Sequence, residues 1–282
     1  MLKKVIPYIL LLPAFILICV FKIMPIIQTL IQGFVIDGQF SFRAYDALFK
    51  DSTFWNSLFV TLKFNVIIIP LQIFISFCLA MLVNLKLKGI TIFRTIYYLP
   101  FTISLAVATL IWSLMFSYNN GVINSILNVF GIEAQGFFTD KRQALLCIVV
   151  LATWKGCGYW MMFLLAGLKS IDASIYESAK IDGAGFLTTV FKITIPLVKK
   201  VLLFVFVANT TANVLMFAPM QMVTQGGPQG STAVLMYEAY KSAFKFSNES
   251  RASALVTILL LLIVCICIVQ FRFLRDKEES VA

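Results

Sequence analysis

The chain has 282 residues, of which 60% are hydrophobic and only 13% are charged, a composition too apolar for a soluble domain of this length. Its net charge of +10 does not indicate nucleic-acid binding, because the lysines and arginines are spread over short segments and form no basic face with interleaved aromatic residues. The sequence therefore predicts an all-α polytopic membrane protein whose surroundings are a lipid bilayer and which has no nucleic-acid partner.

Six apolar segments are predicted to cross the membrane as helices, since each supplies the roughly 20 residues that a helix needs to span a bilayer core. Polar turn sequences at residues 118–121 and 226–228 end two longer apolar runs, so each run is counted as one helix and a loop. The predicted spans are residues 5–28, 58–83, 97–116, 144–168, 197–220 and 252–271. The first is expected to be retained, because no small-x-small cleavage site follows it.

The loops on the outer side are too short to form a further domain, so residues 1–282 are predicted to be a single transmembrane domain. The distribution of basic residues predicts its orientation. With the N-terminus inside, the inner segments hold more lysines and arginines than the outer loops, as the positive-inside rule requires. Both termini and the segment at about residues 169–196 are then expected in the cytoplasm.

Reactive groups for catalysis are scarce in this chain. It has no histidine, the commonest general base and metal ligand. Its six cysteines lie in the predicted spans, where a thiol behaves as a small hydrophobe. The sequence contains no Gly-x-x-x-x-Gly-Lys-Ser/Thr loop for ATP. We expect no catalytic residue, no metal site and no cofactor bound by this chain.

The fourth and fifth predicted spans carry polar residues that are costly in a membrane. Lys155 lies near the middle of a span, where a lysine costs about 2.5–3.5 kcal/mol unless it faces water or a partner. Gly156 is its neighbour, and Tyr159 follows it at i+4 on the same helical face. Asn209 and Asn213 are also four residues apart. Amides and an aromatic ring suit a neutral, hydroxyl-rich sugar, so these five residues are the predicted substrate pathway.

Two other interpretations of these residues remain open. Asparagines in membranes commonly hydrogen-bond from helix to helix, which would give Asn209 and Asn213 a structural role. For Lys155, the competing interpretation is a salt bridge to another subunit.

The polar segment at about residues 169–196 is predicted to fold as a short amphipathic helix, a sharp turn at Gly183 and a second helix. A short helix with one apolar and one charged face can plug the groove of a partner. Ser174 lies three residues before Glu177, which is the spacing of a capping box, so a purely structural role for Glu177 stays open. The two apolar stripes comprise Ile171, Ile175 and Ala179, then Phe186, Val190, Ile193 and Leu197.

The spacing of this segment also resembles a known motif. Glu177-Ser178-Ala179, then Gly183, then Ile193-Thr194-Ile195-Pro196 is similar to the EAA loop of permease subunits of binding-protein-dependent ABC importers. Ser178 replaces an alanine and Ile195 a leucine of that pattern, and both changes are small in volume. The resemblance implies the fold of a type I ABC importer permease, with a cytoplasmic coupling helix between spans four and five.

The resemblance covers most of the chain and extends to the carbohydrate, or maltose-type, branch of these permeases. Matching segments include FRTIYYLP at residues 93–100, GVIN at 121–124 and TQGGP at 224–228. The last is typical of subunits that pair with a second, non-identical permease. The implied partners are that permease, two ATPase subunits that bind ATP and Mg²⁺, and an extracytoplasmic sugar-binding protein. The implied location is the cytoplasmic membrane of a bacterium or archaeon.

The same resemblance implies the roles of residues in the loop. Glu177 would make a polar contact with the ATPase, Ala179 would pack closely and Gly183 would form the turn. The implied ATPase-coupling residues are Tyr176, Glu177, Ser178, Ala179, Asp182, Gly183, Ile193 and Pro196.

We therefore expect a non-catalytic permease subunit of an ATP-driven importer that translocates a carbohydrate. Related solutes such as glycerol phosphate or polyols remain open, and Lys155 would suit an anionic group. The alternative is an ion-gradient-driven secondary transporter or channel, but no acidic residue lies within any predicted span. A membrane enzyme or assembly factor would need reactive groups that this sequence lacks.

Overall fold

The structure is a computed structural model that describes residues 2–36, 38–85 and 87–274. The described part of the chain is helical apart from one two-stranded hairpin, in agreement with the predicted all-α class. The chain divides into two units, one formed by Met1–Trp55 with Glu238–Leu261 and the other by Asn56–Tyr237 with Leu262–Ala282. The predicted cytoplasmic location of the termini refers to Met1 and to the tail at 275–282, which lie outside the described residues.

The first unit begins with a long apolar helix. Residues Leu10–Gln32 are apolar enough to cross a membrane and are 0% buried within this chain. Pro25 lies in the first turn of the helix Met24–Gln32, where the N–H group that proline lacks would have no partner within the helix. The N-terminal segment of the first unit contains α1 (Leu2–Ile18), the π-helical turn η1 (Cys19–Ile23), α2 (Met24–Gln32), β1 (Val35–Ile36), β2 (Gln39–Phe40) and α3 (Arg43–Lys50).

A short hairpin and an ion pair organise the rest of the first unit. Strands β1 and β2 pair antiparallel, with Val35 opposite Phe40. The Arg251 guanidinium lies 2.6 Å from the Asp51 carboxylate and also donates to the Thr53 hydroxyl. The helices α4 (Ser52–Val83), α13 (Leu235–Phe244) and α14 (Glu249–Leu274) each belong partly to this unit and partly to the other.

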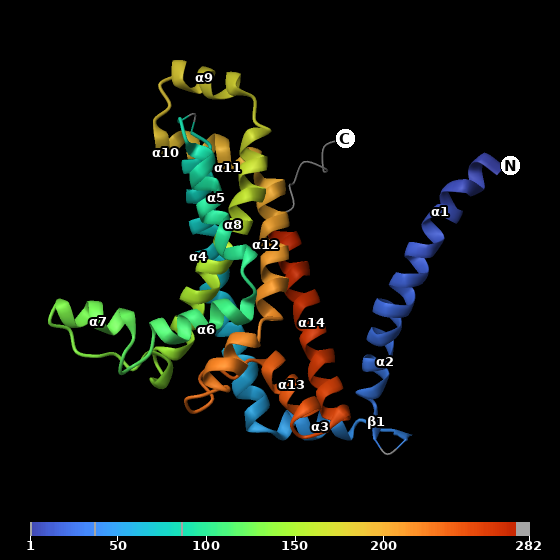
Figure 1. The fold of residues 1–282 in the computed structure, drawn as a ribbon. Helices are drawn as coiled ribbons and strands as arrows, with labels where there is room; N and C mark the ends of the chain where they lie inside the picture. The colour runs from blue at the N-terminus through green and yellow to red at the C-terminus, as the bar shows by residue number, and fades with distance from the viewer. Residues whose placement is uncertain (1, 37, 86, 275–282) are drawn as a thin grey trace. The chain divides into compact units, whose positions relative to one another are not determined.

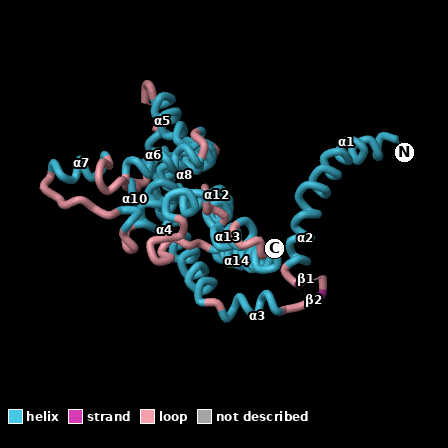
Figure 2. Tube along the Cα trace, turned by 60° about the horizontal axis from the view of Figure 1, so that its bottom comes forward, coloured by secondary structure: helices cyan, strands magenta, loops and turns pink. Residues whose placement is uncertain are grey.

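The second unit holds the long helices that carry the candidate site. Helices α4, α8 and α12 run side by side, and α9 lies at one end of them while α7 projects away nearer the other end (Figures 1 and 2). Its elements are α5 (Ile90–Thr102), α6 (Leu105–Met115), α7 (Val122–Val129), η2 (Phe137–Thr139), α8 (Ala144–Lys169), α9 (Ala173–Ile181), α10 (Phe186–Thr189), η3 (Val190–Thr194), α11 (Ile195–Leu197), α12 (Lys199–Val214) and η4 (Met220–Thr224).

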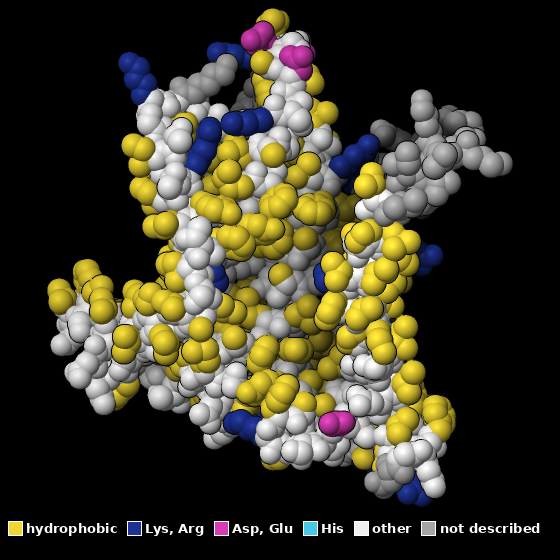
Figure 3. All heavy atoms as spheres, turned by 45° about the vertical axis from the view of Figure 1, so that its right-hand side comes forward, with side chains coloured by type: hydrophobic (Ala, Val, Ile, Leu, Met, Phe, Trp, Pro, Cys, Tyr) yellow, Lys and Arg dark blue, Asp and Glu magenta, His cyan; other side chains and the backbone are white. Residues whose placement is uncertain are grey.

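Two apolar clusters hold the helices of the second unit together. One is built around Phe64 and Ile148, which pack α4 against α8. The other joins α4, α8 and α12 through Ala80, Leu164 and Val205. Acidic and basic side chains gather at the end that carries α9, whereas hydrophobic side chains cover the helices beside it (Figure 3). This division of side chains is that of a helix bundle leaving the apolar part of a bilayer.

Four helices in the described residues are long and apolar enough to cross a membrane: Leu10–Gln32, Ser52–Val83, Ala144–Lys169 and Glu249–Arg272. The number rises to five if α5 and α6 count as one broken span. The predicted fifth span, residues 197–220, contains the 16-residue helix α12, which ends at Val214, and resumes helical structure at residues 218–220 after a break at 215–217.

The predicted third span, residues 97–116, was wrong as a single continuous helix. It starts earlier, at Ile90, and breaks between α5 and α6 with a bend of 97°. The Ser104 hydroxyl at the break accepts a hydrogen bond from the backbone N–H of Val107 and so begins a new helix. Hydropathy reports how apolar a segment is and does not detect such a cap, which explains the error.

Candidate functional site

The polar loop between α8 and α12 folds as the sequence predicts, but with a different cap. The Asp172 carboxylate accepts a hydrogen bond from the backbone N–H of Ser174, 2.9 Å away, and starts α9. This bond from the backbone of Ser174 holds the pKa of Asp172 below its usual value. The capping-box interpretation of Ser174 and Glu177 is therefore wrong, because Ser174 already lies inside the helix. The Glu177 side chain is exposed at the surface of α9.

The predicted coupling residues lie on α9 and on the segment that returns to α12. Ala179 is buried, and the Tyr176 hydroxyl lies 3.2 Å from the Thr194 hydroxyl of η3, which ties the two pieces together. Helix α9 ends at Ile181 with Asp182 as its C-cap residue, and Gly183 turns the chain with a φ of +76°, a conformation that favours glycine. The remaining predicted residues of this group are Ser178 on α9, half-buried Ile193 in η3 and exposed Pro196 in α11.

The predicted second apolar stripe is only partly buried. Val190 packs inside, whereas Phe186 is 70% exposed. Ile181 and Leu187, which the stripe did not include, are also exposed, at 86% and 67%. The loop thus presents a surface of large apolar side chains beside the exposed carboxylate of Glu177.

A cavity of about 590 Å³ lies between α4, α5, α8 and α12. Four predicted pathway residues line it, namely Lys155, Gly156, Tyr159 and Asn213. The fifth, Asn209, does not line it. Asn209 is completely buried, and its side-chain oxygen accepts a hydrogen bond from Asn213.

Gln72 on α4 is a further cavity residue, which the sequence pattern did not predict. Its Nε2 donates to the backbone oxygen of Ala152 at 2.7 Å, and its Oε1 accepts from Nδ2 of Asn213 at 2.9 Å. One amide therefore joins α4, α8 and α12. A Cβ on Gly156 would lie 2.8 Å from Nε2 of Gln72, so the glycine makes room for this amide. The sequence did offer a signal for Gln72: it is a polar side chain inside an apolar span, and burying its amide costs as much as burying those of the asparagines.

Phe101 is the second missed residue, and it supplies an aromatic wall. Its ring stacks on that of Tyr159, with centroids 4.2 Å apart and planes 17° from parallel. Trp160 also packs edge-on against Tyr159, with ring centroids 4.8 Å apart. Phe101 carries no distinguishing signal in an apolar span, because only the packing of α5 on α8 places its ring against Tyr159.

The ammonium group of Lys155 lies against backbone carbonyl groups at the end of α5. Its Nζ lies 2.6 Å from the backbone oxygen of Ile103 and 3.1 Å from that of Phe101. A third carbonyl, of Pro100, is 3.5 Å away. The Phe101 ring centroid is 5.5 Å from the same nitrogen, within the range of a cation–π contact.

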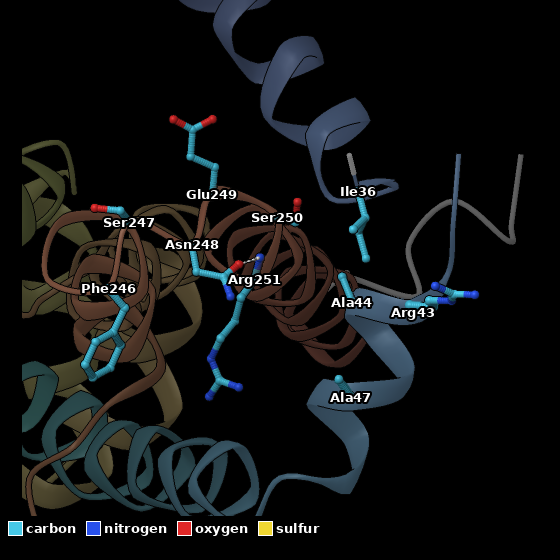
Figure 4. Close-up of a pocket in the computed structure, with 10 residues that line it drawn as sticks. All are labelled: Ile36, Arg43, Ala44, Ala47, Phe246, Ser247, Asn248, Glu249, Ser250 and Arg251. Carbon is cyan, nitrogen blue, oxygen red and sulfur yellow. Dashed lines mark hydrogen bonds between the residues drawn. The ribbon is translucent and has the colours of Figure 1, made fainter. Parts of the chain in front are cut away.

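A second cavity, of about 680 Å³, lies in the first unit and is lined by α3 and the start of α14 (Figure 4). Asn248 accepts a hydrogen bond there from the backbone N–H of Arg251 and so caps α14. The charged head of Arg251 is already held by Asp51. The residues of this cavity thus hold the ends of helices together, and none of the predicted site residues lies in it.

Comparisons with known proteins bear on the family and the fold of this chain. Residues 72–277 match the family described as binding-protein-dependent transport system inner membrane component. The chain is 35% identical to the lactose transport system permease protein LacF of Rhizobium radiobacter, over 87% of this chain and 85% of that protein. It is 30% identical to the sn-glycerol-3-phosphate transport system permease protein UgpA of Salmonella typhimurium, over 96% and 94%. A bacterial ABC transporter that imports the polysaccharide alginate has a similar fold, with a TM-score of 0.83, 21% identity and coverage of 97% and 96%.

Proposed function

The chain belongs to the family of binding-protein-dependent transport inner membrane components and is a permease subunit of an ABC importer, and we propose that it forms one half of a heterodimeric pore for a carbohydrate. It is a multi-pass membrane protein, and ATP hydrolysis belongs to a separate subunit. The proposed assembly contains a second, non-identical permease, two ATPase subunits and an extracytoplasmic solute-binding protein. ATP and Mg²⁺ bind to the ATPase subunits and not to this chain.

The proposed topology has six spans, a single permease domain and both termini in the cytoplasm. The long apolar helices, the broken pair α5–α6 and the 16-residue helix α12 supply six apolar segments for it. The excess of basic residues in the inner segments supports the orientation. In this topology α9 lies on the cytoplasmic side.

Helix α9 is the proposed coupling helix. Glu177 and Ile181 are exposed on α9, and Phe186 is exposed at the start of α10. These side chains give the loop a surface of charged and apolar groups that a groove of a partner protein can receive. The bond between Tyr176 and Thr194 ties α9 to the segment that leads into α12. A displacement of α9 by a closing ATPase pair would therefore reach α12, which lines the cavity.

One observation carries the proposal of a carbohydrate cargo: the cavity of the second unit places the stacked rings of Phe101 and Tyr159 near the amides of Gln72 and Asn213. A sugar offers an apolar ring face to an aromatic ring and hydroxyl groups to amides. The names of the relatives LacF and UgpA refer to lactose and to a glycerol phosphate, and both cargoes are rich in hydroxyl groups.

The experiment for this proposal uses the solute-binding protein that works with the chain. Its melting temperature is measured with a panel of neutral oligosaccharides, polyols, glycerol phosphate, amino acids and inorganic ions, and the solute that stabilises it is then offered to cells. We expect cells that make the full transporter to accumulate this solute, and cells with Tyr159→Ala to accumulate it poorly. If an amino acid or an inorganic ion alone stabilised the binding protein, the carbohydrate assignment would be wrong.

A further inference from the structure

The break between α5 and α6 is stabilised at both of its ends. On the α6 side, the Ser104 hydroxyl accepts from the backbone N–H of Val107 at 3.2 Å. On the α5 side, the Thr102 hydroxyl donates to the backbone oxygen of Leu99 at 2.7 Å. Helix ends inside a membrane must satisfy their backbone groups internally, because lipid offers no hydrogen bonds. These caps leave the carbonyl groups at the very end of α5 still to be satisfied.

Lys155 on α8 satisfies these remaining carbonyls. Its ammonium group has three N–H donors and lies near three backbone oxygens, those of Pro100, Phe101 and Ile103. The C-terminal end of a helix carries partial negative charge. The lysine and the helix end therefore compensate each other, and no acidic residue lies in the predicted spans to do so.

We propose that Lys155 is a positioning residue that holds the bent end of α5 against α8 and thereby sets the Phe101 ring as a wall of the cavity. Phe101 is joined to Lys155 twice, through its backbone oxygen and through its ring. Gly158, one turn further along α8, allows the contact, since a Cβ there would lie 1.9 Å from the backbone oxygen of Tyr97. The statement that this wall belongs to a cargo cavity rests on the proposed function.

This role differs from both interpretations offered by the sequence. In this arrangement the ammonium group is engaged by carbonyl oxygens of its own chain, so it is neither a salt bridge to another subunit nor an open site for an anionic cargo. The cavity then presents neutral amides and aromatic rings to its occupant.

The test measures the bend directly. Spin labels are placed at Ile96 on α5 and Leu114 on α6, which are 56% and 72% exposed, in full-length chain lacking its native cysteines and purified with its partner subunits. Electron–electron double resonance then gives the distance distribution between the labels. We expect Lys155→Arg to keep the wild-type distribution and Lys155→Met to broaden or shift it.

Lys63→Met is the matched control, because Lys63 is an exposed lysine on α4, and it should leave the distribution unchanged. If Lys155→Met does not accumulate in the membrane, Lys155→Gln is used in its place. A broadened or shifted distance distribution would again support the proposal, and an unchanged distribution would again overturn it. A distribution identical to wild type in the variant without the charge would overturn the proposal.

A second measurement separates positioning from simple loss of structure. In uptake assays at equal amounts of membrane-inserted protein, Lys155→Met should raise the solute concentration for half-maximal uptake by up to roughly 10-fold, the limit expected from loss of an aromatic contact, with a smaller change in the maximal rate. Lys155→Arg should restore the wild-type value. If wild-type transporter took up no solute at all, the proposed function would fail, whereas the distance measurement would still decide the role of Lys155.

Discussion

Tyr159 stacks on Phe101 with the two ring centroids 4.2 Å apart, although the residues come from different helices separated by 58 positions. The stack forms because α5 packs closely along α8: a Cβ on Gly158 of α8 would lie 1.9 Å from the backbone oxygen of Tyr97, and Phe101 follows Tyr97 by one turn of α5. The aromatic wall of the cavity is thus a product of the packing of α5 on α8.

Replacing Tyr159 tests whether this wall binds cargo. Tyr159→Ala removes the stacked ring, and an aromatic pair contributes about 0.5–1.5 kcal/mol beyond its buried area. A cargo that rests on this ring would lose a contact of similar size, so we expect the concentration for half-maximal uptake to rise roughly 2- to 10-fold. Tyr159→Phe keeps the stack and should behave much like wild type. Equal uptake kinetics for the alanine variant would show that the wall does not contact cargo.

Replacing Gln72 tests the amide that joins three helices. Gln72→Leu leaves the backbone oxygen of Ala152 and the amide of Asn213 without this partner, and an unsatisfied buried group costs about 1–3 kcal/mol. The melting temperature of the purified protein should fall by several degrees. Thr95→Val is the control, because its exposed hydroxyl bonds only within its own helix, to Thr91. Similar melting curves for Gln72→Leu and wild type would contradict this account of the network.

Two glycines of the coupling loop form a matched pair. Gly183 has a φ of +76°, whereas Gly185 has a φ of −71°, and a Cβ would meet nothing within 4 Å at either position. Gly183→Ala forces a left-handed residue, at roughly 1–2 kcal/mol, and should misplace the end of α9 and reduce uptake severely. Gly185→Ala should be nearly neutral. The amounts of inserted protein are compared by immunoblot, and equal uptake by the two variants would exclude a role for the turn geometry.

The ion pair of Asp51 and Arg251 predicts a pH dependence of stability. Desolvation alone would raise the pKa of Asp51, but hydrogen bonds from Thr53 and the charge of Arg251 outweigh it and lower the pKa. A carboxyl whose pKa is lowered on folding contributes stability above its unfolded pKa, and the contribution is lost as the pH falls through the folded value. Wild type should therefore melt above Asp51→Asn at neutral pH.

This difference in melting temperature should shrink once the pH falls below about 4, the usual pKa of an aspartate. Asp46→Asn is the control, because its pair with Lys50 is 2.7 Å long but has side chains that are 64% and 74% exposed, and such surface pairs contribute little. A constant difference between wild type and Asp51→Asn from pH 7 to pH 3 would argue against the ion pair as its cause.

Hydropathy and motif spacing predicted the helical membrane class and the polar loop with its turn at Gly183, because these depend on local composition and on single residues. The grouping of Lys155, Gly156 and Tyr159 was also predictable, since helical periodicity places them on one face. The bend that ends α5 was not, because it depends on small caps such as Ser104 and on a lysine from another helix.

The same dependence on tertiary structure explains the missed residues. Gln72 and Asn213 are 141 positions apart and meet only because α4 and α12 pack together. Asn209 lies one turn from Asn213 on the same helix, yet it is buried away from the cavity. Sequence spacing identified the polar face of α12, but only packing decides which of its amides reaches the cavity.

The most direct test of the central claim is solute accumulation in reconstituted vesicles. The chain is reconstituted with its partner permease and ATPase subunits, with the loaded binding protein outside and ATP inside, and accumulation is measured over time. We expect accumulation that depends on ATP and on every subunit, and that is lost in Gly183→Ala. Accumulation against a gradient by vesicles that contain this chain alone would contradict it.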